Sequence, residues 1–213
     1  MLAIAGGKGG AGKTTTALCL ARALSGPVTV ADADTDMPNL HLLSGVDRDP
    51  TLAAVADGAD PATVARRWPG SPSVEVLPAP VGPDADRDVA PALSRLAGGE
   101  TPVLVDCPGG AGPDAATALR AADAALVVST RRPSALRDAA KTGEMARAVG
   151  TDLVGAVLTR CRRAPDAAAR LLGCPVLGTV PAVSPPVLPK RRVRDAYDRI
   201  AGAFVRRTAC EDI

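Results

Sequence analysis

The sequence predicts an α/β protein with a doubly wound, mostly parallel β-sheet and helices on both faces. Two observations lead to this prediction. Short apolar runs alternate with longer stretches of helical spacing along the whole chain. The apolar runs contain few polar residues, which is typical of strands that are covered on both faces. The chain has 213 residues, enough for one sizeable core, so we expect a single domain over residues 1–213.

The elements follow in order along the chain. Strands are expected at 2–5, 28–32, 74–79, 102–106, 124–129, 153–159 and 175–180. Helices are expected at 15–24, 88–97, 114–122, 134–149, 165–172 and 192–207. The stretch 46–73 fits neither pattern, and we expect it to be an irregular, mobile surface segment. Ligands of such sheets bind beyond the carboxyl ends of the strands, and the motifs described below lie there.

Composition excludes several classes of protein. The aromatic residues are Trp68, Tyr197 and Phe204, so the core must consist of Ala, Val, Leu and Ile. A net charge of +2 is too small to imply a nucleic-acid or membrane partner by itself. The five cysteines are odd in number and lack CxxC spacing, which indicates neither a disulfide framework nor a metal site. Without a signal peptide or a membrane-spanning apolar run, we expect a reduced, cytoplasmic protein.

Residues 7–14, GKGGAGKT, match the phosphate-loop pattern G-x-x-x-x-G-K-[ST] between a predicted strand and a predicted helix. Glycines let backbone N–H groups converge on an anion, and the helix adds the positive end of its dipole. Lys13 is expected to reach the β- and γ-phosphates, and Thr14 to bind Mg²⁺. The alternative is a merely tight glycine-rich turn. The expected nucleotide-binding residues here are Gly9, Gly10, Ala11, Gly12, Lys13, Thr14 and Thr15.

A second lysine, Lys8, opens the same loop in a chain that has only four lysines. Residues 8–15, KGGAGKTT, resemble the deviant Walker A signature K-G-G-x-G-K-[ST] of the MinD/ParA family of P-loop NTPases. The resemblance implies an ATP-bound sandwich dimer in which Lys8 reaches the partner subunit's nucleotide, so that Lys8 and Lys13 both serve catalysis. The alternative for Lys8 is a solvated loop lysine.

The resemblance covers nearly the whole chain, and residues 122–139 look more like MinD than like plasmid-type ParA. Residues 28–40, VTVADADTDMPNL, resemble the switch I segment of the family. This implies that Asp34 orients the attacking water and that Asp32 lies near the Mg²⁺ shell. The alternative, strongest for Asp36, is that these aspartates cap a helix or a turn.

Residues 102–112, PVLVDCPGGAG, have the form of a Walker B strand that ends in Asp106. Asp106 is expected to bind Mg²⁺ through water, which gives Thr14, Asp32 and Asp106 as the metal set. The resemblance to switch II implies that Gly110 offers its N–H to the γ-phosphate. Cys107 is expected to be a small buried residue, and the lone histidine, His41, an ordinary one packed behind switch I.

Two later segments resemble the base-binding end of the family. Residues 157–163, VLTRCRR, place Thr159 and Arg160 at the adenine-contacting pair, and Pro181 lies in the loop that closes over the base. Arg160 is nearly as compatible with a general surface arginine. The family's MinD members often end in a membrane-inserting helix. The apolar stripe of 193–207 suits either such a helix or a core-facing one.

Together these features predict an ATP-binding and slowly hydrolysing, Mg²⁺-dependent ATPase. We expect it to act as a nucleotide-dependent dimeric switch in intracellular positioning or partitioning. The expected partners are a second copy in the ATP state and a protein activator or cargo adaptor. Basic clusters at 131–132, 162–163 and 190–194 suit either DNA phosphates or an ordinary solvated face. A DNA or membrane partner is thus possible but unsupported. The alternatives are a non-hydrolysing nucleotide-sensing scaffold and an iron–sulfur carrier, the latter disfavoured by the absence of CxxC.

Overall fold

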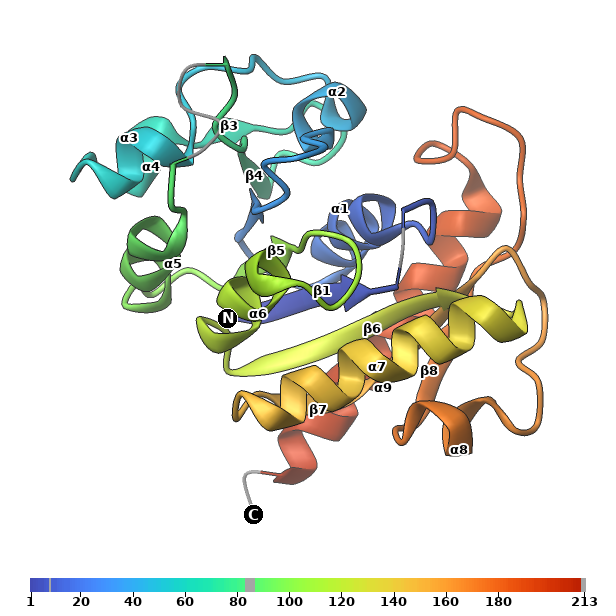
Figure 1. The fold of residues 1–213 in the computed structure, drawn as a ribbon. Coiled ribbons are helices and arrows are strands. Elements are labelled where there is room, and N and C mark those ends of the chain that lie inside the picture. The colour runs from blue at the N-terminus through green and yellow to red at the C-terminus, as the bar shows by residue number, and fades with distance from the viewer. Residues whose placement is uncertain (8, 83–86, 212–213) are drawn as a thin grey trace.

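The computed structural model describes residues 1–7, 9–82 and 87–211 (Figure 1). Within these residues, eight strands form one sheet in the order β3-β4-β2-β5-β1-β6-β7-β8. Every neighbouring pair is parallel except β3 with β4, so the doubly wound, mostly parallel sheet predicted from the sequence is confirmed. The strands are β1 (Leu2–Gly6), β2 (Val28–Asp32), β3 (Arg66–Arg67), β4 (Val74–Leu77), β5 (Val103–Asp106), β6 (Ala124–Thr130), β7 (Asp152–Thr159) and β8 (Val176–Thr179).

Helices fill the connections and cover both faces of the sheet. The longer ones are α1 (Lys13–Ala23), α5 (Ala90–Ala97), α6 (Pro113–Arg120), α7 (Pro133–Ala148) and α9 (Arg191–Glu211). The short ones are α2 (Leu40–Ser44), α3 (Leu52–Ala56), α4 (Pro61–Val64) and α8 (Ala168–Leu172). Each strand and helix expected from the apolar pattern is present, with ends that differ by a few residues.

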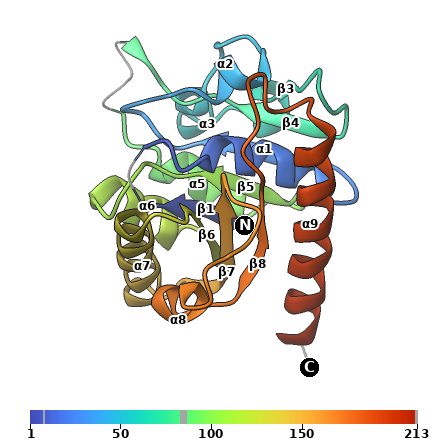
Figure 2. The same ribbon diagram turned by 90° about the vertical axis from the view of Figure 1, so that its right-hand side faces the viewer.

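Strand β1 shows why the central strands are apolar throughout. Leu2 and Ile4 belong to the core cluster that packs with α1 and α9, whereas Ala3 and Ala5 belong to the cluster on the opposite face. Successive side chains of a strand point to opposite faces, so a sheet with helices on both sides buries every position. Figure 2 shows α1 and α9 on one side of the sheet, with α6 and α7 on the other.

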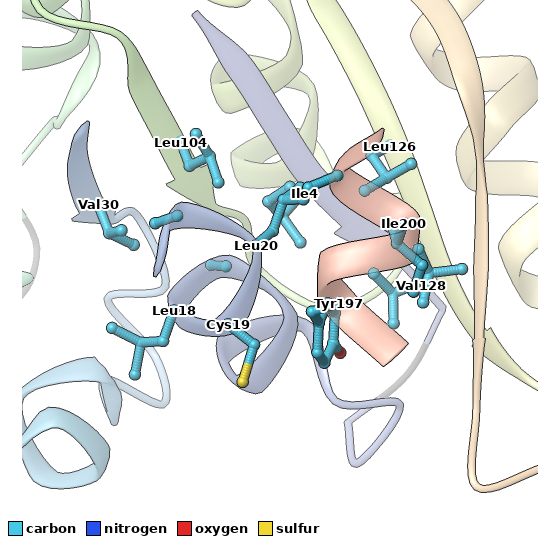
Figure 3. Close-up of a cluster of buried hydrophobic side chains, with 14 of the residues drawn as sticks. Ile4, Leu18, Cys19, Leu20, Val30, Leu104, Leu126, Val128, Tyr197 and Ile200 are labelled. Atoms are coloured by element: carbon cyan, nitrogen blue, oxygen red, sulfur yellow. The ribbon is translucent and has the colours of Figure 1, made fainter. Parts of the chain in front are cut away.

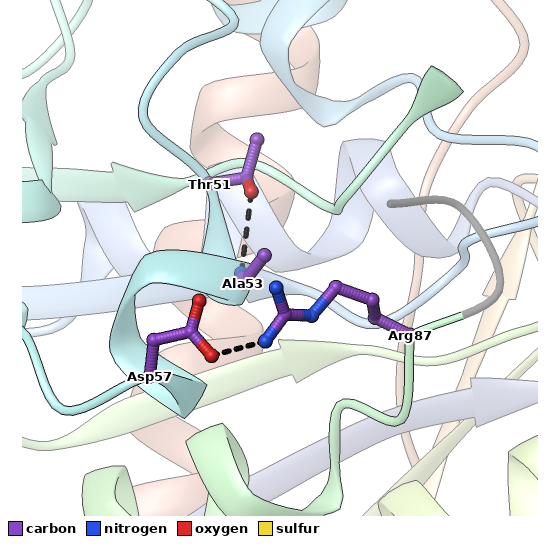
Figure 4. Close-up of polar contacts among 4 residues, drawn as sticks. All are labelled: Thr51, Ala53, Asp57 and Arg87. Atoms are coloured by element: carbon purple, nitrogen blue, oxygen red, sulfur yellow. Dashed lines mark hydrogen bonds and ion pairs between the residues drawn. The ribbon is translucent and has the colours of Figure 1, made fainter. Parts of the chain in front are cut away.

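The stretch 46–73 was expected to be a mobile surface segment, and that expectation is wrong. It contains α3, α4 and β3, and Leu52, Val55 and Val64 are buried in the same cluster as α5. The Thr51 side chain accepts the Ala53 N–H at 3.2 Å and so caps α3. Asp57, at the end of α3, forms an ion pair with Arg87 (Figure 4). Each helix has too few turns to show an apolar period, which explains why the pattern failed here.

Helix α9 carries the apolar stripe for which the sequence left two interpretations. Tyr197 and Ile200 are fully buried against α1 and the sheet (Figure 3). Val193 is fully buried in the same cluster, and Phe204 packs on it. The stripe is therefore core-facing, and the membrane interpretation is wrong for these residues. Among the described residues, no helix is both long enough and apolar enough to cross a bilayer.

Candidate functional site

The glycine-rich turn joins β1 to α1 at the carboxyl edge of the sheet. Gly10 and Gly12 have φ values of 86° and 94°, a left-handed conformation that glycine adopts without strain. Gly12 is the N-cap of α1 and has no side chain, so the first N–H groups of the helix are left for another acceptor. Within the described part of the chain, a Cβ built on Gly9 or Gly10 would have no atom within 4 Å apart from its own residue and the two chain neighbours. The turn is thus an open cradle suited to an anion.

Lys13 begins α1 and is buried despite its charge. A Cβ built on Gly109, in the loop after β5, would lie 3.5 Å from Lys13 Nζ and 3.5 Å from Gly9 N. The loop after β5 therefore packs directly on the glycine-rich turn. A Cβ at position 109 would be in ordinary van der Waals contact with both the ammonium group and the amide. Sequence reasoning singled out Gly110 here and missed Gly109.

Two buried carboxylates lie side by side beneath the turn. Asp32 ends β2 and Asp106 ends β5, and the two are register partners. Burial raises the pKa of Asp32 to about 7, against hydrogen bonds from the N–H groups of Leu40 and Asp34. Burial and the nearby Asp32 raise the pKa of Asp106 to about 8, against the Thr14 hydroxyl and Lys13. Two like charges at such close quarters call for a proton or a cation.

Mg²⁺ fits this arrangement. Among the described residues, Asp106 Oδ1 is buried and has no hydrogen-bond partner. Carboxylate and hydroxyl oxygens are the ligands that Mg²⁺ prefers, and it keeps several waters when bound beside a phosphate. The described part of the chain holds no group of three or more His, Cys, Asp or Glu arranged for a metal. A cation here would therefore complete its shell with Thr14, water and a bound phosphate.

The chain after β2 wraps around Asp32. Its two carboxylate oxygens accept the N–H groups of Asp34 and Leu40, each at 3.1 Å. Asp34 Oδ1 in turn accepts the Met37 N–H at 3.0 Å. Asp32 thus organises the segment that carries Asp34, in addition to adding negative charge at the site. Asp36 is exposed and lines a separate hollow with Asp88 and Asp114.

A hollow of about 260 Å³ brings the turn and this segment together. Of the residues expected from the sequence, it is lined by Gly9, Gly10, Gly12, Lys13, Thr14, Thr15, Asp34 and Arg160. Met37, Asn39 and Leu43 also line it, and sequence reasoning did not assign them to the site. No signal in the residue pattern marked Met37 or Leu43, because an apolar residue after a strand resembles any core position.

Arg160 has a φ of 55°, and among the described residues it is the one non-glycine residue with positive φ. A non-glycine side chain adopts this left-handed conformation at a cost, and such strain concentrates at functional sites. Arg160 also lines a second hollow, of about 510 Å³, together with Gly7, Gly9, Gly10 and Ala11 of the glycine-rich turn. Its expected contact with adenine stays a prediction.

Three other expected residues have contacts of their own in this structure, and their expected nucleotide contacts stay predictions. The Gly110 N–H donates to the Gly6 carbonyl at 3.0 Å, so it is not free for a phosphate in this structure. The Thr159 hydroxyl donates to the Ala11 carbonyl, with Oγ1 at 2.6 Å, and also lies 3.2 Å from the Ser129 carbonyl oxygen, so it supports the turn. Pro181 lines another hollow, together with Arg162, Thr179, Arg192, Asp195 and Arg199.

The remaining expectations concern Ala11, Lys8, Cys107 and His41. Ala11 is buried, and its carbonyl is the acceptor for Thr159. Lys8 lies outside the described residues. Cys107 is a fully buried residue whose thiol pKa is raised by burial, as expected of an inert core cysteine. His41 is half-buried on α2, and burial lowers its pKa.

A glycine-rich cradle at a helix N-terminus, a lysine and buried aspartates at parallel strand ends define the P-loop class of nucleotide-binding folds. The family model of the CobQ/CobB/MinD/ParA nucleotide binding domain matches residues 2–185, and the chain belongs to this family. An uncharacterised ATP-binding protein of Methanocaldococcus jannaschii is 34% identical over 84% of this chain. This chain spans 73% of that relative and 65% of two other curated relatives.

Solved structures agree with this assignment. The cell division ATPase MinD of Pyrococcus furiosus has a TM-score of 0.81 and 29% identity, with 96% of this chain and 98% of that chain covered. The septum site-determining protein MinD of Pyrococcus horikoshii, complexed with Mg-ADP, has a TM-score of 0.80 and 27% identity. That match covers 94% of this chain and 93% of the other.

Proposed function

We propose that this protein binds Mg-ATP at the P-loop, hydrolyses it slowly and acts as a nucleotide-dependent dimeric switch in intracellular positioning or partitioning. The observation that carries the proposal is the buried pair of Asp32 and Asp106, with an unpartnered Asp106 oxygen, beneath an open glycine cradle. Two adjacent buried carboxylates are stable only when a proton or a cation offsets their charge, and Mg²⁺ would take that role when the site is loaded. The Mg-ADP bound to the Pyrococcus horikoshii MinD supports the choice of ligand.

Each group has a role in this proposal. The free N–H groups at the start of α1 bind phosphate oxygens, and Lys13 neutralises charge on the transferred phosphoryl group. Thr14 contributes its hydroxyl to Mg²⁺, and Asp106 holds the ion through water. Bound Mg²⁺ would neutralise negative charge on the phosphates. Asp34 lines the hollow and orients the attacking water by hydrogen bonding.

The dimeric part of the proposal concerns the rim of this hollow. Met37 and Leu42 are exposed by 68% and 73%, and Leu43 by 39%, all in the segment after Asp34. Exposed apolar residues gathered beside a site are typical of surfaces that another subunit covers. In the proposed dimer Lys8 reaches the partner's nucleotide, so ATP favours the dimer through contacts that the monomer lacks. A protein activator or cargo adaptor then binds the dimeric form in preference to the monomer.

Nucleotide binding and dimerisation can be tested by separate experiments. Calorimetry with ATP should show Mg²⁺-dependent binding that Lys13→Ala abolishes and that Lys141→Ala, on the exposed face of α7, leaves intact. Sedimentation with a non-hydrolysable ATP analogue should show a dimer for the wild type and a monomer for Lys8→Ala. A Lys8→Ala protein that still dimerises with ATP would rule out the proposed sandwich.

A second candidate is a non-hydrolysing nucleotide sensor. The observation in its favour is that one Asp34 oxygen accepts the Met37 N–H, which engages that oxygen within its own loop. Product analysis after prolonged incubation distinguishes the two functions. ATP that persists on the folded protein supports the sensor, whereas ADP that accumulates in proportion to protein supports the ATPase.

A further inference from the structure

The one tyrosine of the chain, Tyr197, connects the last helix to the P-loop helix. It is fully buried between α9 and α1, and Figure 3 shows its ring beside Cys19 of α1. Its hydroxyl oxygen lies 2.7 Å from Thr16 Oγ1. Thr16 Oγ1 lies 2.8 Å from the carbonyl oxygen of Gly12, the N-cap of α1. Two hydroxyl groups thus link α9 to the glycine-rich turn.

The direction of these hydrogen bonds follows from the groups themselves. A carbonyl oxygen can only accept, so the single Thr16 hydroxyl proton goes to Gly12. The Thr16 oxygen is then left as the acceptor for the Tyr197 hydroxyl. Burial raises the pKa of Tyr197, so its hydroxyl keeps its proton and remains a donor. The chain of donation runs from Tyr197 to Thr16 to Gly12.

The Gly12 carbonyl is held by two donors, the Thr16 hydroxyl at 2.8 Å and the Thr16 N–H at 2.9 Å. In a planar trans peptide the N–H of the next residue points opposite to the carbonyl. Fixing the Gly12 carbonyl therefore fixes the direction of the Lys13 N–H, one of the free donors at the start of α1. A glycine at φ 94° has no side chain to restrain that peptide plane, so the restraint has to come from elsewhere.

We propose that Tyr197 is a positioning residue for phosphate binding. It holds the Thr16 hydroxyl so that the Gly12–Lys13 peptide presents its N–H to the bound triphosphate. The inference rests on the proposed function, because it concerns the same phosphate site. It also couples the two ends of the chain, so that nucleotide at the P-loop stabilises α9 to the extent that Tyr197 improves nucleotide binding.

The test uses two deletions of a hydroxyl and a matched control. Tyr197→Phe keeps the buried ring, and Thr16→Val removes the middle of the chain. Thr151→Val also deletes a buried hydroxyl, one that donates to the Leu119 carbonyl at 2.7 Å. Thr151 lies just before β7, at the amino ends of the parallel strands and so away from the P-loop. Fluorescence of the single tryptophan, Trp68, confirms folding and measures the stability of each variant. The Kd of Mg-ATP is measured by calorimetry.

Tyr197→Phe is expected to weaken Mg-ATP binding by about three- to tenfold, the effect of losing one buried hydrogen bond. Thr151→Val should lose similar stability without a change in Kd. Thr16→Ser keeps the hydroxyl group and should therefore bind Mg-ATP as tightly as the wild type, whereas Thr16→Val should bind it more weakly. Adding Tyr197→Phe to Thr16→Val should cost nothing further, because both act through one chain.

Equal Kd values for the wild type and Tyr197→Phe would overturn the inference and leave the proposed function standing. A Kd that changes only in step with stability, as strongly in Thr151→Val as in Tyr197→Phe, would overturn it too. Should Tyr197→Phe fail to fold, the comparison of Thr16→Val with Thr16→Ser decides the matter. A wild-type protein that binds no Mg-ATP would remove the proposed function and this inference together.

Discussion

Asp32 and Asp106 face each other as register partners on the adjacent parallel strands β2 and β5, and both side chains are buried. Sequence spacing alone places each carboxylate at a strand end. Only the strand order places them side by side, because β5 follows β2 by some seventy residues in the chain. Ionising both carboxyl groups is therefore costly in the ligand-free protein, and the first prediction tests for this cost.

The stability of the ligand-free protein should fall as the pH rises. Both carboxyl groups have raised pKa values in the folded state, about 7 for Asp32 and about 8 for Asp106, against 3.8 ordinarily. A raised carboxyl pKa contributes stability that is fully present below pH 4 and is lost as the pH rises through 8. The difference between wild type and Asp106→Asn isolates this contribution. Urea unfolding in EDTA, followed by Trp68 fluorescence, measures it.

Asp106→Asn should therefore be more stable than the wild type at pH 8, by several kcal/mol, and nearly equal to it at pH 4. The same variant should lose the Mg²⁺ dependence of nucleotide binding, because an amide is a poor ligand for Mg²⁺. A stability difference that stays constant from pH 4 to pH 8 would contradict the assigned charge repulsion.

Thr159→Val should weaken binding of the phosphate chain and not of the base. Its hydroxyl donates to Ala11 in the glycine-rich turn, so its loss loosens the cradle. We expect the Kd values of Mg-ATP, Mg-GTP and inorganic tripolyphosphate to rise by a similar factor, about three- to tenfold. Competition binding measures all three. A loss confined to ATP would show instead that Thr159 contacts adenine.

Asp34→Asn should separate hydrolysis from binding. The residue lines the hollow but is not a partner of Lys13 or Thr14 in the proposal, so the Kd of Mg-ATP should change little. Loss of the group that orients water should lower kcat by about 10²-fold or more. Phosphate release at saturating ATP measures kcat. Unchanged turnover would assign the orientation of the water to another group.

The cysteines provide a test of packing. Cys19, Cys107, Cys161 and Cys174 are buried free thiols, and burial raises the pKa of each. A Cys210→Ser variant should therefore react with a thiol reagent at pH 8 only after denaturant is added. Absorbance of the released chromophore counts the thiols. Rapid reaction of any thiol in the native protein would contradict the packing of that residue.

Much of the fold and part of the candidate site could be predicted from the sequence. The main strands are visible because a sheet covered on both faces requires continuous apolar runs, and Asp32 and Asp106 follow such runs directly. Gly9, Gly10, Lys13 and Thr14 gather in one hollow because a local motif fixes their spacing.

Contacts between distant segments could not be predicted from local sequence patterns. Thr159 donates to Ala11 across 148 residues, and no local pattern distinguishes a hydroxyl that supports the turn from one that contacts a base. The helices α3 and α4 were missed because their apolar residues are too few to repeat. The direct packing of Gly109, and not Gly110, on Lys13 depends on how the loop folds after β5.

The central claim is that the glycine cradle and the buried aspartate pair together bind a magnesium–nucleotide complex. Calorimetric titration of ATP into the wild-type protein, with Mg²⁺ and with EDTA, tests it most directly. The account predicts saturable binding with Mg²⁺ that is much weaker in EDTA and absent in Lys13→Ala. Equal heats with and without Mg²⁺, or no binding by a folded wild-type protein, would contradict it.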